Sequence, residues 1–277
     1  MTDLIQIPGA SLKLYRDAPS LEGHRTAALG AFACDAAEAG ARVIREAMDF
    51  LRTEGFGAVL GPMDGSTWGK HRLVIESDGR APFLMEPSNP AHHVAAFEQS
   101  GLQIVSRYVS AIRPADVAQS STAQREGFHL RSFNPTQAEQ ELTRIHALSL
   151  EAFADNHFYQ PIALETFLAS YRLILPAVDP ELVFLLETGA GDLKGFLFAV
   201  PNLAEGPQTK TVILKTYASR VKGGGSILAN AFHARAQARG YGEVIHALMH
   251  ESNLSATHSD KTGGKVFRRY ALWGGLL

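Results

Sequence analysis

The segment that most restricts the fold runs from residue 209 to residue 239. The residues TKTVILKTYAS (209–219) have the β-branched, apolar character of a long strand, and SILANAFHARAQAR (226–239) has the composition of a helix. Between them lies RVKGGG (220–225), with three successive glycines. A strand that ends in a glycine loop and continues as a helix predicts an α/β fold with a mixed sheet.

This glycine loop also predicts an anion site. Glycines let backbone N–H groups turn outward, the dipole of the following helix favours negative charge, and Arg220 and Lys222 add positive charge. Two other phosphate loops are excluded. A dinucleotide fingerprint would need glycine where Leu228 stands, and GSTWGK (65–70), followed by His71, has one residue too few between its glycines for a Walker loop.

Two domains are expected, over residues 1–115 and 127–277, because the stretch 113–127 is rich in Ala, Ser and Gln and resembles a linker. In the first domain, a helix at 36–54 is expected to bury Val43, Ala47, Phe50 and Leu51. Further elements expected there are strands at 57–60, 71–77, 82–86 and 102–112 and a helix at 90–100.

The second domain is expected to begin with a strand at 128–133 and a helix from Asn134-Pro135 to about Phe153. The helix at 226–239 is expected to bury Ile227, Ala231, Ala234 and Ala238. The remaining expected elements are a hairpin of 181–188 with 194–201, strands at 243–249 and 265–273, and a short helix at 253–262.

Arg220, Gly223 and Gly225 fit the pattern Arg/Gln-x-x-Gly-x-Gly/Ala, directly after a strand and before a helix. In this the chain resembles the GNAT (Gcn5-related N-acetyltransferase) superfamily, over about residues 127–277. Residues 36–112 look like a partial, degenerate GNAT half without that loop. The resemblance implies acetyl-CoA as cofactor. The residues implied to bind it are Thr216, Tyr217, Ala218, Arg220, Lys222, Gly223, Gly224, Gly225, Ser226 and Asn253.

Acetyl transfer needs a base for the amine, a donor to the thioester carbonyl and a proton for the leaving thiolate. The strand EVIHALMHE (243–251) predicts His246 and His250 on one face and Glu251 on the other, and His250 and Glu251 are the expected catalytic residues. His246 is interpreted as a hydrogen-bonded core histidine. The family's general-acid tyrosine is absent, since Asp260 occupies its position.

The acceptor is expected to contact Trp68 and the stretch His157, Phe158 and Tyr159, although packing or turn formation explains these residues equally well. No metal site is predicted. Four residues of strand separate His246 and His250 by about 13 Å, the adjacent His92 and His93 are expected to face different directions, and there is no cysteine cluster.

Composition excludes several classes of protein. Net charge is −2, but residues 210–277 hold ten Lys/Arg and three Asp/Glu, a net +7 that leaves −9 elsewhere. This asymmetry suits an anionic ligand or a solvated basic face. With one cysteine, no apolar run of membrane length and no signal-peptide pattern, a soluble cytoplasmic protein is expected, without nucleic-acid or membrane partners and with a homodimer left open.

The expected function is transfer of an acetyl group from acetyl-CoA to a small amine. The alternative is a non-catalytic acyl-CoA-binding or sensor module with the same fold, which the absent tyrosine favours. A third alternative, an interaction protein without a ligand, would require the glycine loop to be only a turn.

Overall fold

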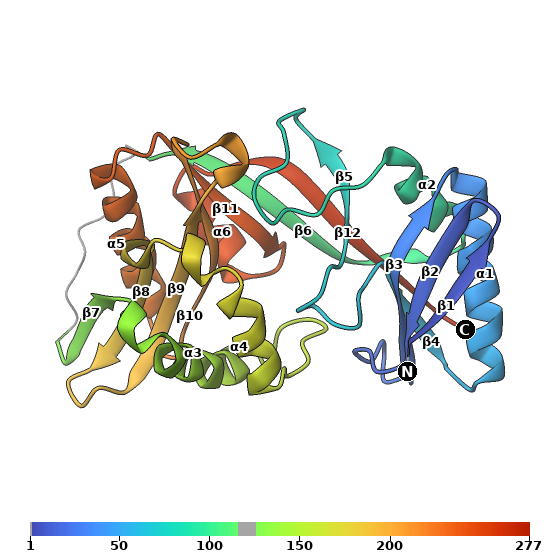
Figure 1. Cartoon of the computed structure of the whole chain (residues 1–277), viewed down its shortest axis with the longest axis horizontal. Coiled ribbons are helices and arrows are strands. Elements are labelled where there is room, and N and C mark those ends of the chain that lie inside the picture. The colour runs from blue at the N-terminus through green and yellow to red at the C-terminus, as the bar shows by residue number, and fades with distance from the viewer. Residues whose placement is uncertain (1, 116–125) are drawn as a thin grey trace. The chain divides into compact units, whose positions relative to one another are not determined.

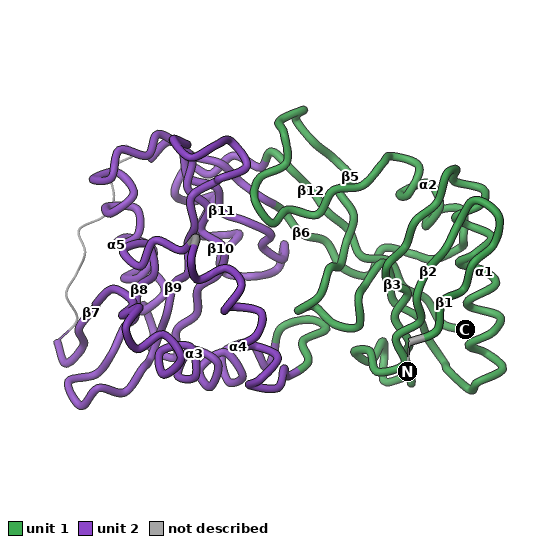
Figure 2. The backbone as a smooth tube through the Cα atoms, in the orientation of Figure 1, with its two compact units in different colours: residues 1–109, 156–160, 267–277 green, residues 110–155, 161–266 purple. Residues whose placement is uncertain are grey.

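The structure is a computed structural model that describes residues 2–115 and 126–277 (Figure 1). It forms two compact units (Figure 2). Unit 1 comprises Met1–Val109, Asn156–Gln160 and Phe267–Leu277, and unit 2 comprises Ser110–Asp155 and Pro161–Val266. Most of the predicted linker, at positions 116–125, lies outside the described residues.

The sheet of unit 1 begins with three antiparallel strands, β1 (Thr2–Ile7), β2 (Ala10–Tyr15) and β3 (Thr26–Cys34). The short strand β4 (Ala58–Gly61) lies parallel to β3, and β12 (Lys265–Leu276), from the far end of the chain, lies antiparallel to β4. β12 also pairs with β5 (Leu73–Ser77), and β6 (Gln103–Pro114) runs from unit 1 into unit 2.

Helices α1 (Ala37–Thr53) and α2 (Ala91–Gln99) pack against each other in unit 1, and α1 covers β2 and β3 (Figure 1). The predicted helices and the burial of Val43, Ala47 and Leu51 are confirmed, but Phe50 is 42% exposed. The core that they cover also includes Leu12, Leu14, Leu29, Ile44, Val59, Phe97 and Trp273.

The strand predicted at 82–86 is wrong, since residues 82–86 form no strand. Met85 has a φ of +67°, which a strand does not allow. The side chain of Glu86 is buried instead, where it accepts hydrogen bonds from Phe83 N at 3.0 Å, from Arg268 Nη1 at 3.3 Å and from the Tyr270 hydroxyl. The hydrogen bonds to β12 therefore determine the conformation of this segment, and its apolar pattern does not.

Unit 2 contains an antiparallel series of strands, β7 (Phe128–Ser132), β8 (Val183–Thr188), β9 (Leu193–Pro201) and β10 (Thr211–Ser219). β11 (Glu243–His250) lies parallel to β10, and β6 follows β11 in the strand order. Short 3₁₀ helices occupy Pro135–Gln137, Leu175–Ala177, Pro180–Leu182 and Leu203–Glu205.

The α-helices of unit 2 are α3 (Ala138–Ala152), α4 (Leu164–Arg172), α5 (Gly224–Ala238) and α6 (Leu254–Lys261). The face predicted for α5 is only partly correct. Ile227 and Ala231 are half-buried and pack against the core, but Ala234 and Ala238 are exposed, and the fully buried positions are Leu228, Phe232 and Ala236. The larger apolar side chains decide which face is buried, because they remove more surface from water than alanines do.

Candidate functional site

The two central strands of unit 2 separate toward their carboxyl ends. Within the described residues, the parallel register of β10 and β11 runs from Thr211↔Glu243 to Leu214↔His246 and ends there, although β10 continues to Ser219. The register of β10 with β9 also shifts between Leu214 and Thr216, as at a β-bulge. The edge of β10 at Thr216, Tyr217 and Ala218, which the resemblance implies for cofactor binding, therefore follows the point where the β11 ladder stops.

The glycine loop lies directly after this edge. Gly223 has a φ of +80° and is the N-cap of α5, a left-handed conformation that glycine adopts without steric cost. A Cβ on Gly224 would collide with Ser219 Oγ and lie 3.1 Å from Leu186 Cδ2, and one on Gly225 would lie 3.3 Å from the Tyr217 ring. The backbone at the start of α5 is therefore packed onto β10 too closely for larger residues.

Side-chain and backbone hydrogen bonds fix the shape of the loop. Ser219 Oγ accepts from Val221 N at 3.1 Å, Arg220 N donates to Lys194 O at 2.8 Å, and Gly224 N donates to Val221 O at 2.9 Å. The N–H groups of the first helical turn have no intrahelical acceptor, so a helix that begins here presents donors and a positive dipole end to an anion. Sequence reasoning missed Ser219, which holds this turn.

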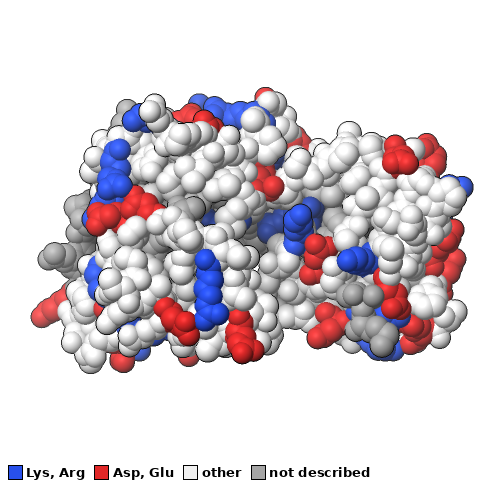
Figure 3. Space-filling model, viewed as in Figure 1, with Lys and Arg blue, Asp and Glu red and all other residues white. Residues whose placement is uncertain are grey.

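Charged groups near the loop are accessible. Arg220 is 55% exposed and its Nε lies 3.8 Å from Glu151 Oε2, while Lys222 and Ser226 are exposed. Elsewhere in the basic C-terminal quarter, Arg235 contacts Glu181 and Arg239 contacts Asp179. On the face drawn in Figure 3, basic and acidic side chains are interspersed. The local charge at Arg220 and Lys222 is therefore more informative than the regional total.

His250 ends β11 and is half-buried, with Glu251 exposed beside it. The His250 Nδ1 atom accepts a hydrogen bond from Ser252 N at 3.2 Å and lies 2.8 Å from Ser252 Oγ. Because a backbone N–H can only donate, this contact makes Nδ1 the unprotonated nitrogen and leaves the proton of the neutral ring on Nε2. The catalytic roles of His250 and Glu251 stay predictions.

His246 is a core residue, as predicted. Its Nδ1 lies 2.7 Å from Ser259 Oγ and its Nε2 lies 3.2 Å from His233 Nε2, and all three side chains are buried. Burial, together with the nearby positive charge of Arg113, lowers the pKa of His246 to about 3. The alternation predicted for β11 is interrupted at Leu248, which has a φ of +56°.

Asn253 is the N-cap of α6, and its side chain makes no capping hydrogen bond. Asp260, at the position of the family's tyrosine, is exposed near the end of the same helix. The Asn253 side chain therefore does not cap its own helix. Position 260 carries a carboxylate in place of an aromatic hydroxyl.

The corresponding edge in unit 1 is occupied by the chain itself. Asp64 Oδ1 accepts from Ala31 N at 2.6 Å, Met63 N donates to Leu29 O at 2.9 Å, and a Cβ on Gly30 would collide with Met63 O and Asp64 Oδ1. Unit 1 thus repeats the pattern of two parallel strands whose register ends early, but segment 63–64 fills the opening. That the N-terminal half does not bind the cofactor stays a prediction.

The four residues expected at the acceptor all lie in unit 1. The Trp68 and Tyr159 rings have centroids 6.2 Å apart, and Trp68 Nε1 donates to Gln160 O at 2.9 Å. His157 stacks on the buried Phe158 ring at 3.8 Å. Trp68 and Tyr159 are therefore brought together from distant parts of the sequence, although their role in binding stays a prediction.

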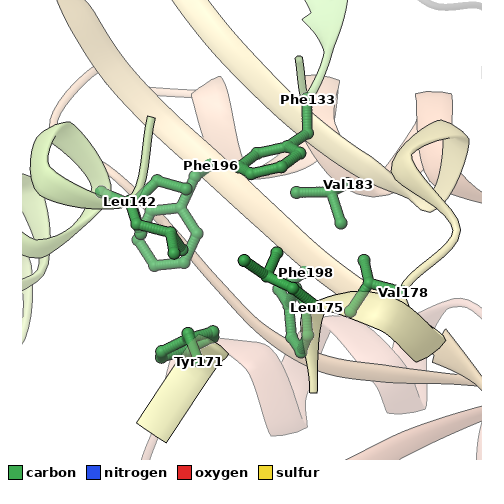
Figure 4. A pocket seen from close by; sticks show the side chains of 9 residues that line it. Phe133, Leu142, Tyr171, Leu175, Val178, Val183, Phe196 and Phe198 are labelled. Carbon is green, nitrogen blue, oxygen red and sulfur yellow. The ribbon is translucent and has the colours of Figure 1, made fainter. Parts of the chain in front are cut away.

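An apolar cavity in unit 2 is too small for a substrate (Figure 4). Its volume of about 20 Å³ is that of roughly one water molecule. Only the Tyr171 hydroxyl brings a polar group to it, and burial raises the pKa of Tyr171 to about 12. The residues that line it are Phe133, Leu142, Ile145, Tyr171, Leu175, Val178, Val183, Phe196 and Phe198.

The expectation that His92 and His93 face different directions is wrong. Their ring centroids lie 5.0 Å apart, and a ring nitrogen of each lies within 4.8 Å of the other and of Cys34 Sγ. Both histidines lie in the first turn of α2, and His92 Nε2 lies 2.9 Å from the carbonyl oxygen of Cys34, the last residue of β3.

None of the described helices is long and apolar enough to cross a membrane. No protein-family model and no curated protein sequence matches the chain. Solved structures do match. A GCN5-related N-acetyltransferase from Sphaerobacter thermophilus matches with a TM-score of 0.60 at 14% identity, covering 97% of this chain and 76% of that one.

Two further structures match over nearly the whole chain. The tandem GNAT protein of the clavulanic acid biosynthesis pathway has a TM-score of 0.51 at 13% identity, covering 97% of this chain and 79% of its own. A GCN5-related N-acetyltransferase from Anabaena variabilis has a TM-score of 0.56 at 9% identity, covering 95% of this chain and 58% of its own. At these identities the likeness concerns the fold, and this chain has the fold of the GCN5-related N-acetyltransferases, extended over both of its units.

Proposed function

We propose that the chain is an N-acetyltransferase that moves an acetyl group from acetyl-CoA to a small amine, with the cofactor held by unit 2. The observation that carries the proposal is the start of α5, where Gly223, Gly224 and Gly225 present a helix N-terminus directly after the unpaired end of the β10–β11 ladder. A pyrophosphate is the kind of anion that such a helix end binds.

Each group of residues in this site would have a separate role in binding or catalysis. The N–H groups at Gly225 and Ser226 would hold phosphate oxygens, and Arg220 and Lys222 would neutralise their charge. A backbone N–H of Thr216–Ala218 would donate to the thioester carbonyl and stabilise negative charge that develops on its oxygen. Bound acetyl-CoA supplies the acetyl thioester.

Glu251 is the base in this proposal. It would accept the proton that the attacking amine loses, while His250 keeps its proton on Nε2 because Ser252 N–H occupies Nδ1. The proton that the leaving thiolate needs is supplied by water, since position 260 carries no tyrosine.

Substitution of Glu251 separates catalysis from binding. We expect Glu251→Gln to lower kcat by about 100-fold or more, the typical contribution of a general base, and to leave acetyl-CoA affinity within about two-fold. The measurement is thiol release from acetyl-CoA over a panel of small amines, at saturating cofactor. Glu165→Gln, at an exposed glutamate of α4, is the matched control and should retain full activity.

A second candidate function is favoured by Asp260, which replaces the tyrosine that would serve as general acid. In this candidate the chain binds acyl-CoA without turnover. Thiol release that no amine stimulates, together with unimpaired cofactor binding, would favour this candidate. Equal turnover by the wild type and by Glu251→Gln would show that Glu251 is not the base.

A further inference from the structure

A cluster of three metal-ligating side chains lies in unit 1, away from the site in unit 2. Cys34 is the last residue of β3, and His92 and His93 are the second and third residues of α2. Cys34 Sγ and one ring nitrogen of each histidine lie within 4.8 Å of one another. We infer that these three residues bind one Zn²⁺ ion, with the fourth position open to water.

The separation of these atoms is close to that in a zinc site. With Zn–N bonds of about 2.0 Å and Zn–S bonds of about 2.3 Å, ligand atoms of a tetrahedral site lie about 3.3–3.8 Å apart. The observed limit of 4.8 Å requires the atoms to approach by about 1 Å. This approach requires rotation of the half-buried histidine side chains.

The donor set selects the kind of metal. A thiolate with two imidazoles suits Zn²⁺, whereas Mg²⁺ and Ca²⁺ prefer oxygen ligands. Three protein ligands with a free fourth position are typical of zinc sites that bind water or a substrate. The proton of the Cys34 thiol passes to the buffer when the Zn–S bond forms.

Three further features surround the cluster. His92 Nε2 lies 2.9 Å from the carbonyl oxygen of Cys34, a contact that zinc-ligating histidines commonly make through their second ring nitrogen. The Phe32 ring meets the His93 ring edge-on at 5.0 Å and forms an apolar wall. A Cβ on Gly40 would lie 2.8 Å from Cys34 Sγ, so the absence of a side chain there leaves room for the thiol.

Metal titration of the full chain tests this inference. The chain is first dialysed against a chelator, then titrated with Zn²⁺ in competition with a chromophoric chelator and, separately, with Co²⁺. We expect one equivalent of tight binding and, with Co²⁺, the near-ultraviolet charge-transfer band of a cobalt–thiolate bond. Cys34→Ser should abolish that band, and Cys34→Ser and His93→Gln should each weaken Zn²⁺ binding by more than about 10-fold.

The matched control is His24→Gln, at an exposed histidine of unit 1 outside the cluster, and it should bind Zn²⁺ like the wild type. Circular dichroism melts of the metal-free variants establish that each one folds. Wild-type affinity equal to that of Cys34→Ser, a cobalt spectrum without a thiolate band, or equal losses in His24→Gln and His93→Gln would each overturn the inference.

Discussion

Gly224 stands where no side chain fits. Its missing Cβ would collide with Ser219 Oγ, which holds the loop turn, and would crowd Leu186 of β8. The close approach of α5 to β10 therefore depends on this one residue, and the donors of the helix N-terminus depend on that approach.

Gly224→Ala should lower stability and cofactor binding together. Overpacking at a tight position costs about 1–3 kcal/mol, so we expect a lower urea midpoint for unfolding and at least a 10-fold loss of acetyl-CoA affinity. Gly189→Ala is the control, since no atom lies within 4 Å of a Cβ built there. An alanine at 224 that left both quantities unchanged would show that the loop relaxes freely.

Some properties of single residues were predictable from the sequence, and others were not. The core role of His246 was predictable, because a histidine in an apolar strand is commonly buried and hydrogen-bonded. The tautomer of His250 was not, because it depends on the turn that brings Ser252 N back to Nδ1. The convergence of His92 and His93 on Cys34 depends in the same way on a contact between residues 58 positions apart.

At the scale of elements, the strands β7 and β8 and helix α3 of unit 2 are joined by a buried ionic cluster. Arg131 of β7 contacts Glu187 of β8 at 2.7 Å and Glu141 of α3 at 2.8 Å, and Arg144 also contacts Glu187 at 2.7 Å. Burial acts to raise the pKa of Glu187, but Arg131 and Arg144 outweigh it and lower the pKa to about 2.

This cluster predicts acid sensitivity in unit 2. The ordinary pKa of this carboxyl is 4.5, and its pKa in the folded state is lower. Such a carboxyl stabilises the fold at pH values above 4.5. The stabilisation, about 3 kcal/mol by order of magnitude, should be lost as pH falls from about 4.5 to about 2. Urea unfolding followed across this range should show a decrease in the free energy of unfolding.

Glu187→Gln should flatten that pH dependence and lower stability at neutral pH, since Arg131 and Arg144 lose a charged partner. Glu139→Gln, at a 69% exposed glutamate paired with Arg172, should keep the wild-type profile. An unchanged slope in Glu187→Gln would assign the acid sensitivity to other groups.

Elements with strong local patterns were predicted well. The apolar period of α1 and α3, the hairpin of β8 and β9, and the strand–loop–helix of β10 and α5 all lie within a few residues of their predicted positions. The buried face of α5 does not follow from residue spacing alone, because Leu228 and Phe232 bury more apolar surface than the alanines do. The strands β1, β2 and β3 and helix α4 were not predicted. Residues 82–86 were predicted as a strand because of their apolar pattern, although they form none.

At the scale of the whole molecule, the chain exchanges segments between its units. Asn156–Gln160 and most of β12 belong to unit 1, although both follow long stretches of unit 2 in sequence. The unit to which each segment belongs depends on its distant partners, such as β4 for β12 and Trp68 for the segment Asn156–Gln160. Such long-range pairing leaves no periodic trace in a single sequence, which is why the last strand was predicted and its pairing with β4 was not.

The central claim is that unit 2 binds acetyl-CoA at the start of α5. Isothermal titration calorimetry of the full chain with acetyl-CoA and with free CoA tests it most directly, with Lys222→Ala as the variant and Lys13→Ala, at an exposed lysine of β2 in unit 1, as the control. The account predicts saturable binding of both ligands at one site per chain, weakened several-fold in Lys222→Ala and unchanged in Lys13→Ala. No heat from either ligand at millimolar concentration, or equal affinity in all three proteins, would contradict it.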